Sequence, residues 1–183
     1  GLYSNINVQL GAGIQEYEIV DGIIYNPDMT AVIKATAAAT GSYVMPDTVT
    51  EIEPYAFAGS NLTAITLGSG VTEIAYSTFD GAISLEEITI PESVRYIHGL
   101  SGFSSCTNLK RVNIFDLNAW CEIHFGENPL AYAHDLYLNG EKIVDLVLPE
   151  TVAEGVYSNN KINYNAFMGG SFESVTIPTR IDD

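Results

Sequence analysis

Three consecutive stretches of this chain repeat one pattern of apolar residues, and a fourth copy lies near its end. The first three copies begin at Val49, Val71 and Val94, at intervals of 22 and then 23 residues. The fourth copy covers residues 166–178. A unit this short cannot bury its own apolar side chains, so successive units must stack on one another. The repeat therefore predicts a solenoid whose equivalent residues form columns along one shared core.

Within each copy, an L-x-x-I-x-I/L segment predicts a short main strand. The predicted main strands are 62–67, 85–90, 109–114 and 172–177. Their Leu, Ile and Val residues are expected to face the core, and their Thr, Glu, Arg and Asn residues to face outward. Pro91, Pro149 and Pro178 follow such strands, and we expect them to end the ladders because proline has no N–H to donate. A second short extended segment starts at each V-x-x-I, and an Ala-Phe pair or its equivalent is expected to fill the bend that follows. Little helix is expected.

Two regions differ from this pattern. Residues 1–48 are predicted to be an N-terminal capping segment, in which Asp21-Gly22 joins two apolar runs as a tight hairpin turn. Residues 49–183 are predicted to hold the repeats, with an irregular coil at 115–143 and an inserted loop near 153–165. The whole chain is expected to form one structural domain.

Composition and charge limit the classes of partner. The chain has 183 residues, of which 46% are hydrophobic, enough for one domain with a full core. Its formal charge is −16. A surface of this sign repels phosphate backbones and anionic lipids, so nucleic acid is a poor partner. No segment reaches the roughly 18 apolar residues of a membrane span, so membrane attachment requires an anchor that this sequence lacks.

Residues of the types found in catalytic and metal sites occur only in weak patterns. Cys121 and His124, with His134 and Asp135 nearby, lack the second ligand pair of a recognised zinc site. The segment 99–102 falls one residue short of a G-x-S-x-G elbow. We therefore predict no catalytic residues, no metal and no cofactor. Cys106 is not in the same column as Cys121, so two free and mostly buried thiols are expected.

The repeat resembles the BspA-like leucine-rich repeat family of bacterial surface proteins over residues 49–114 and 144–178. Cys106, which precedes Thr-x-Leu, and the segment Ala119-Trp120-Cys121 are similar to features of that family. The resemblance implies an all-β-rich, right-handed leucine-rich-repeat solenoid with a parallel main sheet. It also implies an exported protein displayed on a bacterial cell or secreted, whose signal segment has been removed from this chain. Its partner is then a protein of a host or neighbouring microbial surface.

The candidate binding residues lie on the outward face of the main sheet and in the irregular coils. The sheet residues are Thr63, Thr66, Glu87, Thr89, Lys110, Arg111 and Asn113, and the aromatic residues are Trp120, Tyr132 and Tyr157. The aromatic residues either anchor a partner or cover the core where the repeat fails. We expect a monomeric, noncatalytic module for protein binding or adhesion. The alternatives are a carbohydrate-binding or accessory module of a surface enzyme system, and a structural spacer.

Overall fold

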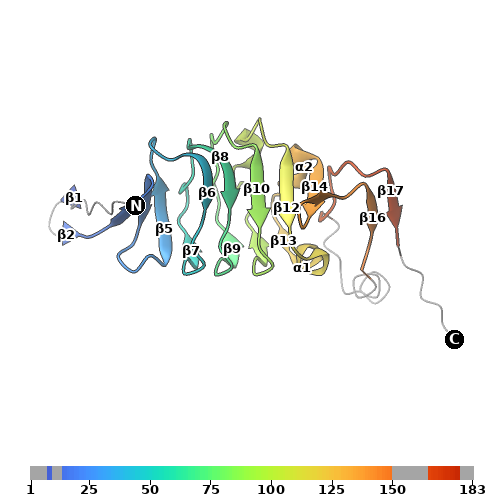
Figure 1. Ribbon diagram of the computed structural model, residues 1–183, viewed down its shortest axis with the longest axis horizontal. Coiled ribbons are helices and arrows are strands. Elements are labelled where there is room, and N and C mark those ends of the chain that lie inside the picture. Colours follow the sequence, from blue (N-terminus) through green and yellow to red (C-terminus); the bar gives the residue numbers. More distant parts are fainter. Residues whose placement is uncertain (1–7, 10–13, 150–164, 178–183) are drawn as a thin grey trace.

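The chain forms an elongated stack of coils in the computed structural model, which describes residues 8–9, 14–149 and 165–177. The coils follow one another along the long axis, from the hairpin at the N-terminal end to the last strand at the C-terminal end (Figure 1). The main sheet contains β6 (Thr40–Val44), β8 (Asn61–Thr66), β10 (Glu87–Ile90), β12 (Arg111–Ile114) and β14 (Asp135–Leu138), all parallel, and an antiparallel edge strand, β15 (Glu141–Lys142). This architecture confirms the leucine-rich-repeat solenoid with a parallel main sheet.

Shorter strands form the opposite side of each coil. They are β7 (Glu51–Ile52), β9 (Glu73–Ile74), β11 (Tyr96–Ile97) and β13 (His124–Phe125). The last three pair in parallel, and β7 pairs in parallel with β5 (Ala31–Ala35). Each V-x-x-I segment thus supplies the second extended segment that the repeat predicts. A bend then leads the chain back to the main sheet.

The N-terminal hairpin forms where the Asp-Gly turn is predicted. β3 (Glu18–Val20) and β4 (Ile23–Tyr25) are antiparallel, and both turn residues have positive φ, 49° at Asp21 and 82° at Gly22. The structure adds that β5 and β6 belong to the two sides of the solenoid, so coiling begins before residue 49. A separate antiparallel pair, β1 (Val8–Gln9) and β2 (Ile14–Gln15), precedes the hairpin.

Phenylalanine side chains fill the bends, as the repeat predicts. Phe57, Phe79 and Phe103 are fully buried, and their ring centroids lie 5.7 and 4.8 Å apart in successive coils. Tyr43 extends this column into the first coil, 5.9 Å from Phe57. Aromatic contacts therefore link four successive coils through one side of the core.

The irregular coil retains the stacking and replaces part of its extended chain with short helices. α1 (Leu117–Glu122) begins at Asp116, whose carboxylate accepts a hydrogen bond from the Ala119 N–H at 2.7 Å. α2 (Leu130–Ala133) replaces the phenylalanine bend, and a 3₁₀ turn at Phe103–Ser105 occupies that bend one coil earlier. Strand β14 follows α2, in a stretch where the repeat is barely recognisable in the sequence.

The fourth predicted main strand is placed differently from the other three. β17 (Ser174–Thr176) pairs in parallel with β16 (Asp145–Val147) in a separate two-stranded sheet. The chain turns back at Asn139-Gly140, so β15 takes the edge of the main sheet beside β14. Among the described residues, β17 therefore does not join the main sheet. The predicted loop near 153–165 lies outside the described residues, apart from its last position.

Candidate functional site

The main sheet brings the predicted sheet residues together on one face. The strand register aligns Glu87 with Arg111, and Thr66 with Thr89 and Asn113. Lys110 lies one coil beyond Glu86, whose N–H donates to the Thr63 carbonyl. The seven residues thus fall in three rows along β8, β10 and β12, and the buried row of Ile65, Ile88 and Val112 separates the last row from the other two.

Charged side chains on this face pair between coils. Lys110 Nζ lies 3.1 Å from a Glu86 carboxylate oxygen, and Arg111 lies 3.7 Å from Glu87. Glu87 also accepts a 2.7 Å hydrogen bond from the Asn113 amide. The Arg111 guanidinium stacks over the ring of Tyr137 in the next coil, 4.2 Å from its centroid. The basic side chains predicted to contact a partner therefore already have partners within the sheet.

Some predicted residues are poorly placed for contact. Thr89 and Asn113 are each only 8% exposed. Trp120 is 1% exposed and donates a 2.9 Å hydrogen bond to the Ala166 carbonyl. The prediction that Trp120 anchors a partner is therefore wrong, and its burial agrees with the alternative, that it covers the core. Tyr132 is 38% exposed, and Tyr157 lies outside the described residues.

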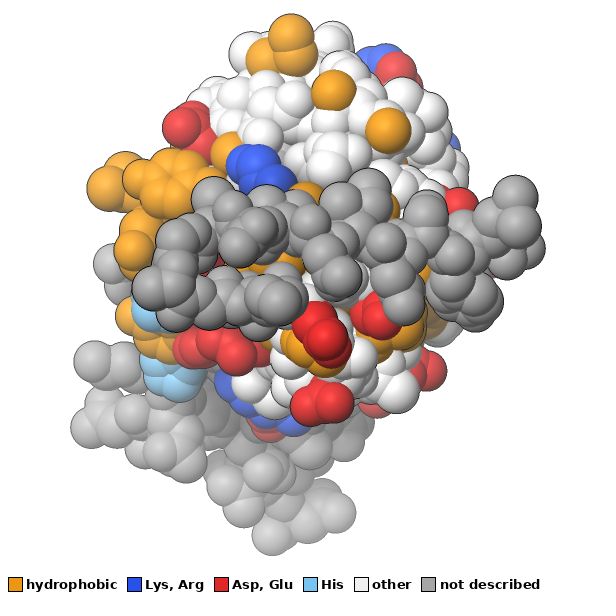
Figure 2. All heavy atoms as spheres, turned by 90° about the vertical axis from the view of Figure 1, so that its left-hand side faces the viewer, with side chains coloured by type: hydrophobic (Ala, Val, Ile, Leu, Met, Phe, Trp, Pro, Cys, Tyr) orange, Lys and Arg blue, Asp and Glu red, His pale blue; other side chains and the backbone are white. Residues whose placement is uncertain are grey.

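A second set of exposed aromatic residues lies on the side of the solenoid formed by the short strands. Tyr96 and His124 are aligned by the register of β11 and β13, and their rings are nearly parallel with centroids 6.2 Å apart. Tyr55 and Tyr76 meet edge to face at 6.1 Å. Viewed from the N-terminal end, hydrophobic and histidine side chains gather along the same flank (Figure 2). Aligning the outward positions of the second strands would have found Tyr96 and His124 in the sequence.

A groove runs along the carboxyl ends of the main strands, and we call it the strand-end groove. Its lining residues are Val44, Met45, Pro46, Asp47, Thr66, Leu67, Ser69, Pro91, Glu92, Ser93 and Phe115, and its volume is about 750 Å³. Equivalent positions of four successive coils contribute to it.

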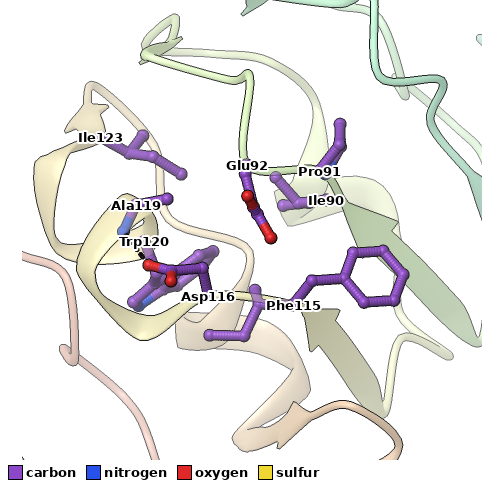
Figure 3. Close-up of a pocket in the computed structure, with 9 residues that line it drawn as sticks. Ile90, Pro91, Glu92, Phe115, Asp116, Ala119, Trp120 and Ile123 are labelled. Carbon is purple, nitrogen blue, oxygen red and sulfur yellow. Dashed lines mark hydrogen bonds between the residues drawn. The ribbon is translucent and has the colours of Figure 1, made fainter. Parts of the chain in front are cut away.

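A smaller pocket adjoins this groove at α1. The two share Pro91, Glu92 and Phe115, and Trp120 and Ile123 line the pocket from α1 and its C-terminal end. Figure 3 shows the Glu92 side chain between α1 and the Ile90–Pro91 segment, with Phe115 pointing away from that helix. Glu92 therefore lies where the groove and the pocket meet.

The groove carries carboxylates without basic partners. Asp47 accepts a 2.8 Å hydrogen bond from the Ser69 N–H, which lowers the pKa of the Asp47 carboxyl and keeps it ionised. Arg95 donates to the backbone carbonyl of Glu92, but its ion pair is with Glu122. In the described part of the chain, no Lys or Arg forms an ion pair with Asp47 or Glu92. The groove thus differs from the sheet face, whose charges are paired.

The residues weighed as metal ligands and nucleophiles have other roles. His134 has positive φ at the end of α2, and its Nδ1 hydrogen bonds with the Gly169 carbonyl at 2.8 Å. Cys106 and Cys121 are buried free thiols, as predicted, and burial raises the pKa of each to about 12. No three His, Cys, Asp or Glu side chains gather as a metal site within the described ranges. Nor does any helix there have the length and apolar composition to span a bilayer.

Comparisons with known structures support the fold. A leucine-rich repeat protein from Eubacterium ventriosum is 24% identical with a TM-score of 0.51, and the match covers 90% of this chain and 40% of that one. The pneumococcal vaccine antigen PcpA is 19% identical with a TM-score of 0.53, and that match covers 90% of this chain and 48% of the antigen. This chain therefore spans less than half of either structure. No curated protein matches it.

A family model gives the more specific result. The model, described as BspA type Leucine rich repeat region (6 copies), matches residues 37–134. These residues include β6 to β13, that is, the regular coils and part of the irregular one. Since the match covers more than half of the chain and agrees with the stacked coils, the chain belongs to the BspA-type leucine-rich repeat family.

Proposed function

We propose that this chain is a noncatalytic protein-binding module of an exported bacterial surface protein. The outer face of its main sheet contacts a protein on a host cell or on a neighbouring microbe. The localisation rests on the family and on the pneumococcal antigen, a protein of the same fold. The binding role rests on the sheet face itself.

The observation that most favours this role is the pairing of side chains across coils. Ion pairs link Glu86 with Lys110 and Glu87 with Arg111, and a hydrogen bond links Glu87 with Asn113, so these side chains have partners before a ligand arrives. A surface with ordered side chains loses less conformational entropy when it binds. Thr63 is exposed beside these pairs and has a small side chain, so a partner can approach closely there.

A binding assay with a matched pair of variants tests the proposal. The chain is used to capture host matrix proteins, and any captured protein is then titrated against Thr63→Arg and Thr107→Arg. Thr107 is exposed on a bend outside the sheet, so it receives the same substitution away from the proposed face. We expect Thr63→Arg to weaken binding by about tenfold, equivalent to about 1.4 kcal/mol, and Thr107→Arg to leave it unchanged. Equal effects of the two variants would contradict the proposed face.

Carbohydrate binding is the second candidate, and the parallel rings of Tyr96 and His124 favour it. Tyr55 and Tyr76 do not extend these rings into a flat platform, because they meet at 89°. A glycan array run beside the protein assay separates the two functions. If the chain binds only sugars, and Tyr96→Ala abolishes that binding, carbohydrate binding replaces the protein-binding proposal. A structural spacer predicts no binding in either assay.

A further inference from the structure

The strand-end groove has exposed apolar side chains at both ends. Val44 is 72% exposed at the end of β6, and Phe115 is 49% exposed just after β12. Three strand-to-strand steps of roughly 4.8 Å, about 14 Å in all, separate β6 from β12, and Phe115 lies two residues beyond Asn113, the position that the register aligns with Val44. An extended chain covers that distance in about four residues, and in a strand residues i and i+4 face the same side.

The charges between these two ends are negative. Asp47 and Glu92 both line the groove, and Asp47 is kept ionised by the Ser69 N–H. Neither carboxylate forms an ion pair with a Lys or Arg of the described residues, whereas Glu86 and Glu87 on the sheet face both do. A ligand that brings a cation to the groove gains an interaction that no Lys or Arg in the described part of the chain makes.

We propose that the strand-end groove binds an extended segment of a partner protein, with apolar side chains at positions i and i+4 and a Lys or Arg between them. The apolar side chains cover Val44 and Phe115, and the cation lies beside Glu92 and Asp47. The inference rests on the proposed protein-binding function and gives it a second surface, with a stated ligand chemistry.

The shape of the groove follows from its sequence. Pro46 and Pro91 occupy equivalent positions on either side of Gly68, in the coil between them. A Cβ on Gly68 would lie 2.5 Å from the Pro46 carbonyl oxygen, so only glycine allows the coils to approach this closely. The spacing of these two coils beside the groove therefore depends on glycine at position 68.

The test uses two synthetic peptides of five residues, acetylated and amidated. In the first, Leu occupies positions one and five, Arg position three and Ser the remaining positions; in the second, Glu replaces Arg. Each is titrated into the isotope-labelled chain, and NMR follows the methyl groups of Val44 and the backbone amide of Ser69. We expect the Arg peptide to shift both signals, and the Glu peptide to shift them only at much higher concentration.

Three variants separate a groove effect from a general charge effect. Glu92→Gln and Asp47→Asn each remove one groove charge. Each is expected to weaken the affinity of the chain for the Arg peptide by about two- to fivefold. Glu86→Gln removes the same charge from the sheet face and is expected to leave the affinity unchanged. All three positions are exposed, so the fold should persist, and thermal unfolding of each variant checks this.

The inference is overturned if Val44 and Ser69 do not shift, if the Glu peptide binds as well as the Arg peptide, or if all three variants weaken binding equally. Its failure is distinct from failure of the proposed function. If Thr63→Arg still weakens the binding of a captured protein and Glu92→Gln does not, the sheet face remains the proposed binding surface and the groove proposal is rejected.

Discussion

Phenylalanine side chains at the bends stack on one another in successive coils. Phe79 lies between Phe57 and Phe103, with ring centroids 5.7 and 4.8 Å away, and all three rings are fully buried. A buried aromatic side chain in such a column contributes both its buried area and its ring contacts. Phe79 should therefore be among the residues on which the stack depends most.

Replacing Phe79 with alanine tests this contribution. Phe79→Ala leaves a cavity against two rings, and we expect the free energy of unfolding to fall by about 3–5 kcal/mol. Urea denaturation measures the change. Ile83→Ala serves as the control, because Ile83 is exposed on the following bend, and its effect should be within about 0.5 kcal/mol. A Phe79→Ala effect as small as the control's would show that the column does not stabilise the fold.

The two thiols make the unfolding free energy depend on pH in the alkaline range. Burial raises the pKa of Cys106 and of Cys121 from 9.0 to about 12. Above pH 9 the unfolded chain loses thiol protons that the folded chain keeps, so stability should fall as the pH rises from about 9 toward 12. The double variant Cys106→Ala/Cys121→Ala should lack this part of the decline in urea denaturation. An unchanged decline in the variant would contradict the buried thiols.

At the scale of the bend, each coil depends on residues with left-handed backbone. Tyr55, Ser77 and Leu100 have positive φ at the bends. Glycines with positive φ follow at Gly59 and Gly81, two residues after each phenylalanine, and at Gly102, directly before Phe103. Gly102 has a second constraint, because a Cβ there would lie 2.4 Å from the backbone nitrogen of Asp80 in the preceding coil. Gly102 thus links the geometry of the bend to the distance between coils.

Two glycine substitutions separate these constraints. Gly59→Ala and Gly102→Ala both place alanine at positive φ, 65° and 93° respectively, which costs about 1–2 kcal/mol. Nothing lies within 4 Å of a Cβ at Gly59, so only Gly102→Ala must also push two coils apart. We expect Gly102→Ala to cost about 1–3 kcal/mol more than Gly59→Ala in urea denaturation. Equal costs would mean that the coils separate freely at this bend.

The sequence predicts the strands and bends whose characteristic residues all lie within a single repeat. The strands that contain Ile65, Ile88 and Val112 follow from the L-x-x-I-x-I segments, and the bends follow from the phenylalanines. β14 was missed because α1 and α2 lie where neighbouring coils have extended chain and a bend. Trp120 offered two interpretations, and only the hydrogen bond to Ala166, 46 residues away in sequence, decides between them.

The candidate surfaces were predicted only in part, for a related reason. Outward positions of the main strands follow from alternation, so the sheet face could be named in advance. Whether Lys110 and Arg111 are free or paired depends on side chains one coil away. Alternation within a single strand does not show which residues of the neighbouring strand are aligned with it. The strand-end groove needs residues from four coils, of which only Pro46, Gly68 and Pro91 leave a trace in the sequence.

At the scale of the whole molecule, the stack presents two surfaces of different character. The sheet face contains charges that balance each other, whereas the groove carboxylates of Asp47 and Glu92 form no ion pair with a Lys or Arg of residues 14–149 and 165–177, in a chain with a formal charge of −16. Exposed charges attract a cationic ligand less as salt screens them. Binding in the groove should therefore weaken with ionic strength more than binding at the sheet face.

The stacking of coils in register underlies both surfaces, and methyl NOE spectroscopy on the isotope-labelled chain tests it most directly. Ile65, Ile88, Val112 and Leu136 are buried at equivalent positions of successive main strands. The fold predicts NOEs between Ile65 and Ile88, between Ile88 and Val112, and between Val112 and Leu136. It predicts none between Ile65 and Leu136, which are three strands apart. A strong NOE between Ile65 and Leu136, or the absence of all three neighbouring contacts, would contradict the solenoid.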